Sequence, residues 1–563
     1  MLTDDYNKIC KDIIEQTMKS IKTSNMKKYP DINKGDVRNG DITYKTAAAD
    51  KFPITLVNTP AGTGKSNIIK DRVFALIGQR VPPKKIMILN MNISKVKQMK
   101  NELPQNIQIY TFSQFAHNIF QENFPNMFAL SDNTSIRNKL MLSVTGQNDV
   151  ENKLIQRLNM TDPQEKITIL TLLINQYPEE ILSILKTIAK TSYTMETLLC
   201  QNMMYSLEKD PYKVDSIIIN GVHNMPVPIL CCVLEYANKY KTNLFITGTN
   251  DETIYEFNMA CKNTMRILSS WQSRDISIIR LSQSKINPAI NNVIEMKRTN
   301  DLPGIKTKYI NSQKQSIETA IQTALSAKTT DFISDKLSNK EQILILARSN
   351  QEIKTIKSIM ESEYDLKNHK IIDLTEIQIP KTTYGTILAK YNRYLTNKYK
   401  NGITSMQLKY ELYEIYKKEI KNTDLKHQIT IYTNDKSNIS DFVDKIFSFL
   451  KDTNQPYDTR FIINGVIEYE SKSRQKTMQK MENMNPPDFK SADLIFATIH
   501  SAIDLRSNNT IVIFNNLNEE QNANLYHVAL SRANKSEYIV FIDNPKFPNK
   551  HYKYLTNYIS DEK

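Results

Sequence analysis

Short hydrophobic runs alternate with helical patterns early in the chain. The runs Ile54–Val57, Lys85–Asn90 and Ile107–Thr111 predict buried strands. Between them, Ser66–Ile77 and Ser94–Leu103 carry patterns typical of helices. Strands that alternate with helices form parallel sheets covered by helices. The pattern therefore predicts an α/β domain built on a parallel sheet.

The same alternation returns twice later in the chain, separated by stretches that look mainly helical. Further strands are predicted at Ser216–Ile219, Leu244–Thr247, Ile276–Leu281, Gln342–Ala347, Leu494–Thr498, Thr510–Phe514 and Tyr538–Asp543. An amphipathic helix is predicted at Gln351–Met360. We therefore expect an α/β fold with two parallel-sheet domains, each carrying a mainly helical insertion.

These patterns set the expected domain boundaries. Residues 1–50 are a polar, lysine-rich lead-in that includes a helix. The first α/β domain is expected at 51–120 and 206–285, with a helical insertion at 121–205. The second is expected at 286–375 and 491–563, with a helical insertion at 376–490.

Composition excludes several classes of protein. The chain has 563 residues, too many for one core, and 40% of them are hydrophobic, as in globular proteins. It has no uninterrupted apolar stretch of about 18 residues, and Met1–Lys11 lacks a secretory signal core. The five cysteines form no CxxC pair, so neither a disulfide scaffold nor a zinc site is expected. We expect an intracellular protein of a reducing compartment, cytoplasm or nucleus, not secreted and without a membrane partner.

The formal net charge is +14. Clustered lysines would suit a polyanion such as a nucleic acid, because binding releases counterions from the phosphate backbone. A lysine-rich composition spread over a solvated surface would give the same total. Charge alone leaves both interpretations open.

A phosphate-binding loop is predicted at Asn58–Ser66, between a strand and a helix. Gly62 and Gly64, with Thr63 between them, let the backbone curl so that its N–H groups face phosphate oxygens. The helix that follows directs its positive end at the same anion. Lys65 would contact the terminal phosphates of ATP, and Ser66 would bind Mg²⁺. The usual first glycine of such a loop is Thr59 here.

Six segments in order resemble motifs of superfamily 1 helicases of the UvrD/Rep/PcrA type. They are Ile86–Leu103, Tyr110–Ala116 (similar to "TFHSFA"), Leu244–Phe257 ("VGDDDQSIYGF"), Ile343–Asn350 ("AVLYRSN"), Ala497–Ala502 ("MTIHSAKG") and Leu525–Ala533 ("YVALTRA"). The resemblance implies two RecA-like domains with ATP in the cleft between them and single-stranded DNA across their top.

The resemblance also implies roles for particular residues. Arg348 and Arg532 would bind ATP, with Arg532 as a catalytic arginine finger beside Lys65. This is notable because only 15 residues of the chain are arginine. The residues at nucleic-acid-binding positions are Thr111, Phe112, Phe257, Thr498 and His500. Core packing is the alternative role for the two phenylalanines, and it is favoured for Phe112.

The acidic motif of the family, typically "VDEAQD", is degenerate in this chain. Asn220 stands where the family has the aspartate of the magnesium shell, and Gly221 where it has the glutamate that polarises water. His223 replaces a glutamine. Because phosphoryl transfer depends on positioned charge, these changes predict impaired ATP hydrolysis.

Other motif positions differ as well. Glu252 replaces a water-sensing glutamine, Ile286 or Lys285 an arginine finger, and Ile503-Asp504 a Lys-Gly pair. The upstream glutamine that reads adenine is also missing, since no glutamine lies between Gln16 and Gln79.

Three functions follow from these features. The first is an ATP- and single-stranded-DNA-binding, helicase-related protein of replication, repair or recombination whose ATP hydrolysis is impaired. The second is an active helicase or translocase with relocated catalytic acids, for which Asp251 and Glu252 are candidates. The third is a non-catalytic structural subunit of a nucleoprotein complex, with protein partners in replication. RNA is an alternative to DNA, and a nucleotide kinase is disfavoured by the length and by the late Arg532 segment.

Overall fold

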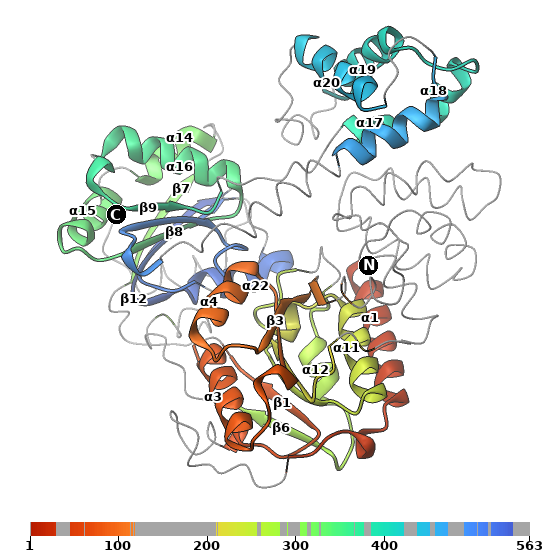
Figure 1. The fold of residues 1–563 in the computed structure, drawn as a ribbon. Coiled ribbons are helices and arrows are strands. Elements are labelled where there is room, and N and C mark those ends of the chain that lie inside the picture. The colour runs from red at the N-terminus through yellow and green to blue at the C-terminus, as the bar shows by residue number, and fades with distance from the viewer. Residues whose placement is uncertain are drawn as a thin grey trace.

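Two six-stranded sheets organise the computed structural model of this chain (Figure 1). The structure describes residues 2–29, 46–60, 62–112, 114–115, 118, 210, 212–255, 260–281, 290, 305–311, 317–325, 328–364, 366–375, 384–420, 436–450, 456–470, 489–503, 505–515 and 519–543. Every strand pairing within both sheets is parallel. The predicted α/β class with two parallel-sheet domains is confirmed.

The first sheet forms the lower part of the molecule in Figure 1. Its strand order is β3 (Gln108–Thr111), β2 (Ile86–Asn90), β4 (Ser216–Asn220), β5 (Asn243–Gly248), β1 (Ile54–Asn58) and β6 (Ile276–Arg280). Neighbours in this order are far apart in sequence. The carboxyl ends of β1, β5 and β4 therefore lie side by side at one edge, where ligands of open α/β sheets bind.

Helices cover both faces of the first sheet because successive strand residues point to opposite sides. Ile218 of β4 packs with α3 (Lys65–Gly78) and α4 (Ile93–Glu102), whereas its neighbours Ile217 and Ile219 pack on the other side. That side is covered by α1 (Leu2–Ser20), α11 (Val227–Lys239) and α12 (Thr264–Ser269). The helix of the expected lead-in thus belongs to the first core, where Ile14 is fully buried.

The second sheet has the order β7 (Ile305–Asn311), β12 (Ala533–Asp543), β11 (Ser507–Asn515), β8 (Ile343–Ala347), β10 (Leu494–Thr498) and β9 (Ile371–Asp373). One face packs against α14 (Ile317–Leu325), α15 (Lys328–Ser338) and α16 (Asn350–Glu363). The other face packs against α22 (Glu519–Leu530). Sequence patterns predicted neither β7 nor β9.

Helices α17 (Tyr384–Lys390), α18 (Asn392–Lys398), α19 (Ser405–Ile420) and α20 (Lys436–Phe449) lie within the second expected insertion. The first expected insertion, 121–205, lies outside the described residues. No helix in the described part of the chain has the length and apolar character to cross a membrane.

Candidate functional site

The phosphate loop joins β1 to α3, as the sequence predicts. Gly62 and Gly64 have φ angles of 80° and 89°, in the left-handed region that favours glycine. The Thr63 hydroxyl donates a hydrogen bond to the Pro60 carbonyl at 2.8 Å, and the Thr59 amide donates to the Gly248 carbonyl at 2.7 Å. These bonds fix the curl of the loop and tie it to the end of β5. The N-terminus of α3 therefore opens at the carboxyl edge of the sheet, where it favours an anion.

A cavity of about 280 Å³ lies between this loop and the second domain. On the first-domain side its lining residues are Pro60, Gly62, Gly64, Lys65, Ser66, Asn67 and Glu252. On the second-domain side they are Ile503, Arg506, Arg532 and Asn534. Two residues that sequence motifs singled out separately, Lys65 and Arg532, thus share one cavity.

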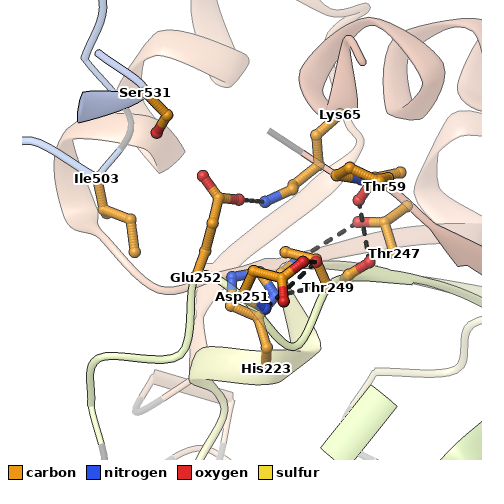
Figure 2. Close-up of polar contacts among 12 residues, drawn as sticks. Thr59, Lys65, His223, Thr247, Thr249, Asp251, Glu252, Ile503 and Ser531 are labelled. Atoms are coloured by element: carbon orange, nitrogen blue, oxygen red, sulfur yellow. Dashed lines mark hydrogen bonds and ion pairs between the residues drawn. The ribbon is translucent and has the colours of Figure 1, made fainter. Parts of the chain in front are cut away.

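Glu252 bridges the two domains inside this cavity, and Figure 2 shows its contact with Lys65 of the first domain. Its carboxylate accepts from Lys65 Nζ at 2.7 Å and from Arg532 Nη2 at 2.6 Å. Burial alone would raise the pKa of Glu252, but Lys65 and Arg532 hold that pKa well below its ordinary value. The carboxylate is therefore ionised and engaged by a cation from each domain.

Arg532 follows α22 and is held rigidly. Its guanidinium donates to the Val528 carbonyl at 2.8 Å and to the Ile503 carbonyl, in addition to Glu252. The residue is only 2% exposed. A fixed, buried guanidinium facing the phosphate loop fits the role expected of a finger on a terminal phosphate.

Asn220 ends β4 and Gly221 follows it, and these are the two positions at which the sequence predicts the missing acids. Asn220 is buried, and its side-chain amide donates to Asn90 Oδ1 at 2.7 Å. Gly221 follows with φ 80°, and its amide donates to the Thr247 carbonyl at 3.1 Å. This left-handed backbone favours glycine. A glutamate at position 221 would therefore strain the backbone.

His223, in the turn that follows β4, is a buried and neutral side chain. Its Nδ1 accepts a hydrogen bond from the Thr249 amide at 3.2 Å (Figure 2). Burial, and then the charge of Lys65, lower the pKa of His223 to about 3. At neutral pH it therefore carries no charge toward a phosphate, and it orients the loop that follows β5.

The segment that follows β5 also connects the two domains. The Tyr255 hydroxyl donates to the His500 carbonyl at 2.9 Å, and the Asn524 amide donates to the Thr253 carbonyl at 2.8 Å. Ile254 and Tyr255 join the hydrophobic core on the α22 face of the second sheet. A change at Glu252 can therefore affect how the domains are held together.

The residues expected to bind nucleic acid have different surroundings. Phe112 is 1% exposed and packs in the first core, as its alternative role expects. Thr111 ends β3 and accepts from the Gln114 amide through its hydroxyl. Thr498 ends β10 and pairs with the Ser501 hydroxyl, next to the partly buried His500. Phe257 lies outside the described residues.

Two other arginines differ from expectation. Arg348 follows β8, is exposed, and is not among the described residues that line the cavity. Arg506 was missed by sequence reasoning and does line it. Burial and the charge of Arg532 lower the pKa of Arg506 to about 10, although Glu252 opposes this. The scarcity of arginine, together with its position just after the Ala497–Ala502 segment, was the available signal.

Comparison with known proteins gives one family match. Residues 44–216 match the model of the UvrD/REP helicase N-terminal domain. No curated protein matches the chain. The matched region contains the phosphate loop and ends as β4 begins, so Asn220, Glu252 and Arg532 lie beyond it.

Proposed function

The chain belongs to the UvrD/Rep-type superfamily 1 helicases, and from this premise we propose that it binds ATP between its two parallel-sheet domains with impaired hydrolysis. We further propose that it binds single-stranded DNA and acts in replication, repair or recombination. The family generally uses ATP and Mg²⁺. One observation carries the nucleotide proposal: Lys65 of the phosphate loop and Arg532 of the second domain meet in one cavity, joined by Glu252.

The chemistry of this cavity suits a nucleotide phosphate chain. Two left-handed glycines, a lysine at the start of α3 and the positive end of that helix face it from the first domain. Arginines face it from the second domain. A phosphate would exchange with the Glu252 carboxylate on the same cations. ATP would then link the domains through its own charge.

Impaired hydrolysis is inferred from the end of β4. Phosphoryl transfer needs a group that orients the attacking water and acids that hold the metal. Gly221 has no side chain for the first role, and Asn220 offers a neutral amide turned to Asn90 for the second. His223 is neutral and bonded to Thr249. Lys65 and Arg532 would support binding of the triphosphate without completing the machinery for its cleavage.

The nucleic-acid part of the proposal rests on the family and on charge. The formal net charge of +14 favours a polyanion. Thr111 ends β3 of the first sheet, Thr498 ends β10 of the second, and His500 contacts Tyr255 where the domains meet. These positions suit a single-stranded nucleic acid that crosses both domains. Nucleotide binding between the domains would then change the affinity for that nucleic acid.

A second candidate function is an active motor in which Glu252 replaces the missing acids. The observation in its favour is the position of the Glu252 carboxylate, 2.7 Å from Lys65 Nζ in the cavity. It is ionised, as a general base must be. However, it would have to leave Arg532 before it could act on water. A structural subunit of a nucleoprotein complex, with single-stranded DNA or RNA as partner, is the third candidate.

Nucleotide binding and turnover separate these candidates. We would measure ATP affinity by calorimetry and phosphate release with and without oligo(dT), using Lys65→Ala and the exposed-lysine control Lys100→Ala. The proposal expects binding that Lys65→Ala weakens at least about tenfold, because a charge-assisted contact is lost. It expects little phosphate release under any condition.

DNA-stimulated turnover that disappears in Lys65→Ala would refute impaired hydrolysis and support the active motor. If ATP does not bind but oligo(dT) does, in a fluorescence anisotropy measurement, the structural-subunit function is supported instead.

A further inference from the structure

The cavity carries an excess of positive charge that does not depend on a metal ion. Three of its described lining side chains are cationic, namely Lys65, Arg506 and Arg532. Glu252 is the one acidic side chain among the described lining residues, and it already pairs with two of the cations. With all four groups ionised, three cations and one carboxylate give the lining a net charge of about +2.

The residues near the loop fit a magnesium ion poorly. Ser66 is present in the lining, but the aspartate position of the metal shell is Asn220, whose amide donates to Asn90. Asp251 is turned to the Thr249 hydroxyl at 3.2 Å. Magnesium binds preferentially through carboxylate oxygens and phosphates. Of the two carboxylates in the segment that follows β5, Glu252 is paired with Lys65 and Arg532, and Asp251 accepts from the Thr249 hydroxyl.

We propose that this cavity binds nucleoside triphosphates without Mg²⁺, and that Arg506 supplies the third positive charge that makes the ion unnecessary. This inference rests on the proposed function, because it concerns the same nucleotide site. It assigns Arg506 a binding role that the helicase motifs of this chain do not give it.

Electrostatics supports the replacement of Mg²⁺ by side-chain cations. In most P-loop sites the metal ion neutralises part of the charge between the terminal phosphates. Here the triphosphate would enter a site where Arg532 is 2% exposed and Lys65 is partly buried, so each charge acts in a medium of lower dielectric than water. Arginine also binds phosphate oxygens through two parallel hydrogen bonds. Displacement of the Glu252 carboxylate would free Lys65 Nζ and Arg532 Nη2 for the phosphate chain.

The test is the metal dependence of binding itself. We would titrate fluorescent N-methylanthraniloyl-ATP into the full chain in MgCl₂ and in EDTA, and compete it with unlabelled ATP and inorganic tripolyphosphate. We expect the two dissociation constants to differ by less than about threefold, since the side chains supply the charge. Tripolyphosphate should compete in EDTA, because the phosphate chain carries the recognition.

Variants of Arg506 test whether this residue supplies the third positive charge. Arg506→Gln should weaken binding in EDTA about tenfold, or about 1.4 kcal/mol, whereas Arg506→Lys should retain most of it. Arg274→Gln is the matched control, because it removes an exposed arginine at the opposite edge of the first sheet and should change nothing. The Lys variant also shows whether a loss in Arg506→Gln reflects charge or folding.

The possible results are distinct. Binding in MgCl₂ but not in EDTA would overturn this inference and leave the proposed nucleotide binding standing. No binding in either buffer would overturn both. Unchanged EDTA binding in Arg506→Gln would overturn the role of Arg506.

Discussion

The substitution Glu252→Gln tests whether an internal carboxylate occupies the phosphate position. Glu252 bridges Lys65 and Arg532 at 2.7 Å and 2.6 Å in a buried setting. The neutral amide of glutamine removes the charge while nearly preserving the shape. Arg532 would then be left as a buried cation without its anionic partner, which costs about 3–5 kcal/mol for a buried pair. We therefore expect a lower melting temperature for the free protein.

The same substitution should strengthen nucleotide binding. ATP no longer competes with the carboxylate, and its phosphates restore the missing negative charge. We expect the dissociation constant for ATP to fall at least about tenfold, equivalent to about 1.4 kcal/mol. The ATP-induced rise in melting temperature should exceed that of the wild type. Calorimetry and thermal-shift measurements on the same samples check both effects.

Asp251→Asn is the matched control, because it removes a neighbouring charge whose oxygen bonds to the Thr249 hydroxyl. It should leave ATP affinity nearly unchanged. Weaker ATP binding in Glu252→Gln would refute the idea that the carboxylate competes with phosphate. If the wild type hydrolyses ATP and Glu252→Gln binds ATP without hydrolysing it, Glu252 is the general base of an active motor.

Three further predictions concern the same region. Gly221→Ala should destabilise the chain by about 1–3 kcal/mol in denaturant unfolding, because φ is 80° there; an unchanged midpoint would contradict the strained backbone. His223 should make stability depend on pH: its folded pKa, about 3, lies below the ordinary 6.5, so its contribution is complete above pH about 6.5 and is lost as the pH falls toward 3. The slope should reach about 1.4 kcal/mol per pH unit and flatten in His223→Gln when unfolding is measured across that range. ATP and GTP should bind within about threefold of each other in competition titrations, because the adenine-reading glutamine is missing and charge dominates recognition; strong discrimination would reveal a base contact.

Local patterns determined much of the architecture. Buried strands alternate side chains between two faces, so their hydrophobic runs are visible without a structure. The phosphate loop was also predictable, because Gly62 and Gly64 occupy backbone positions that other residues enter at a cost. The sequence also predicted that Asn220 and Gly221 take the positions of the missing acids. A strand places its last residues at a known edge of the sheet, so these positions could be located without a structure.

Local patterns did not predict the burial of the lead-in helix or the existence of β7, because packing decides both. Helix α1 has a sequence that suits an exposed lead-in, yet its buried residues complete the core beneath α11. Strand β7 carries lysines at alternate positions, and its pairing with β12 is what gives it a place in the sheet. The places of both elements in the fold depend on partners that are remote in sequence.

The sequence by itself determined two parallel-sheet domains, and it predicted a phosphate loop and the absence of the expected acids. Only the tertiary structure decided what fills the site. Glu252 lies 187 residues from Lys65 and 280 from Arg532, and Arg506 shares their cavity without belonging to a recognised motif position. Hydrophobic periodicity predicts which face of its own helix or strand a residue occupies. Whether Glu252 reaches the cations depends on how the two domains pack. The same packing determines whether a carboxylate or a phosphate can balance those cations.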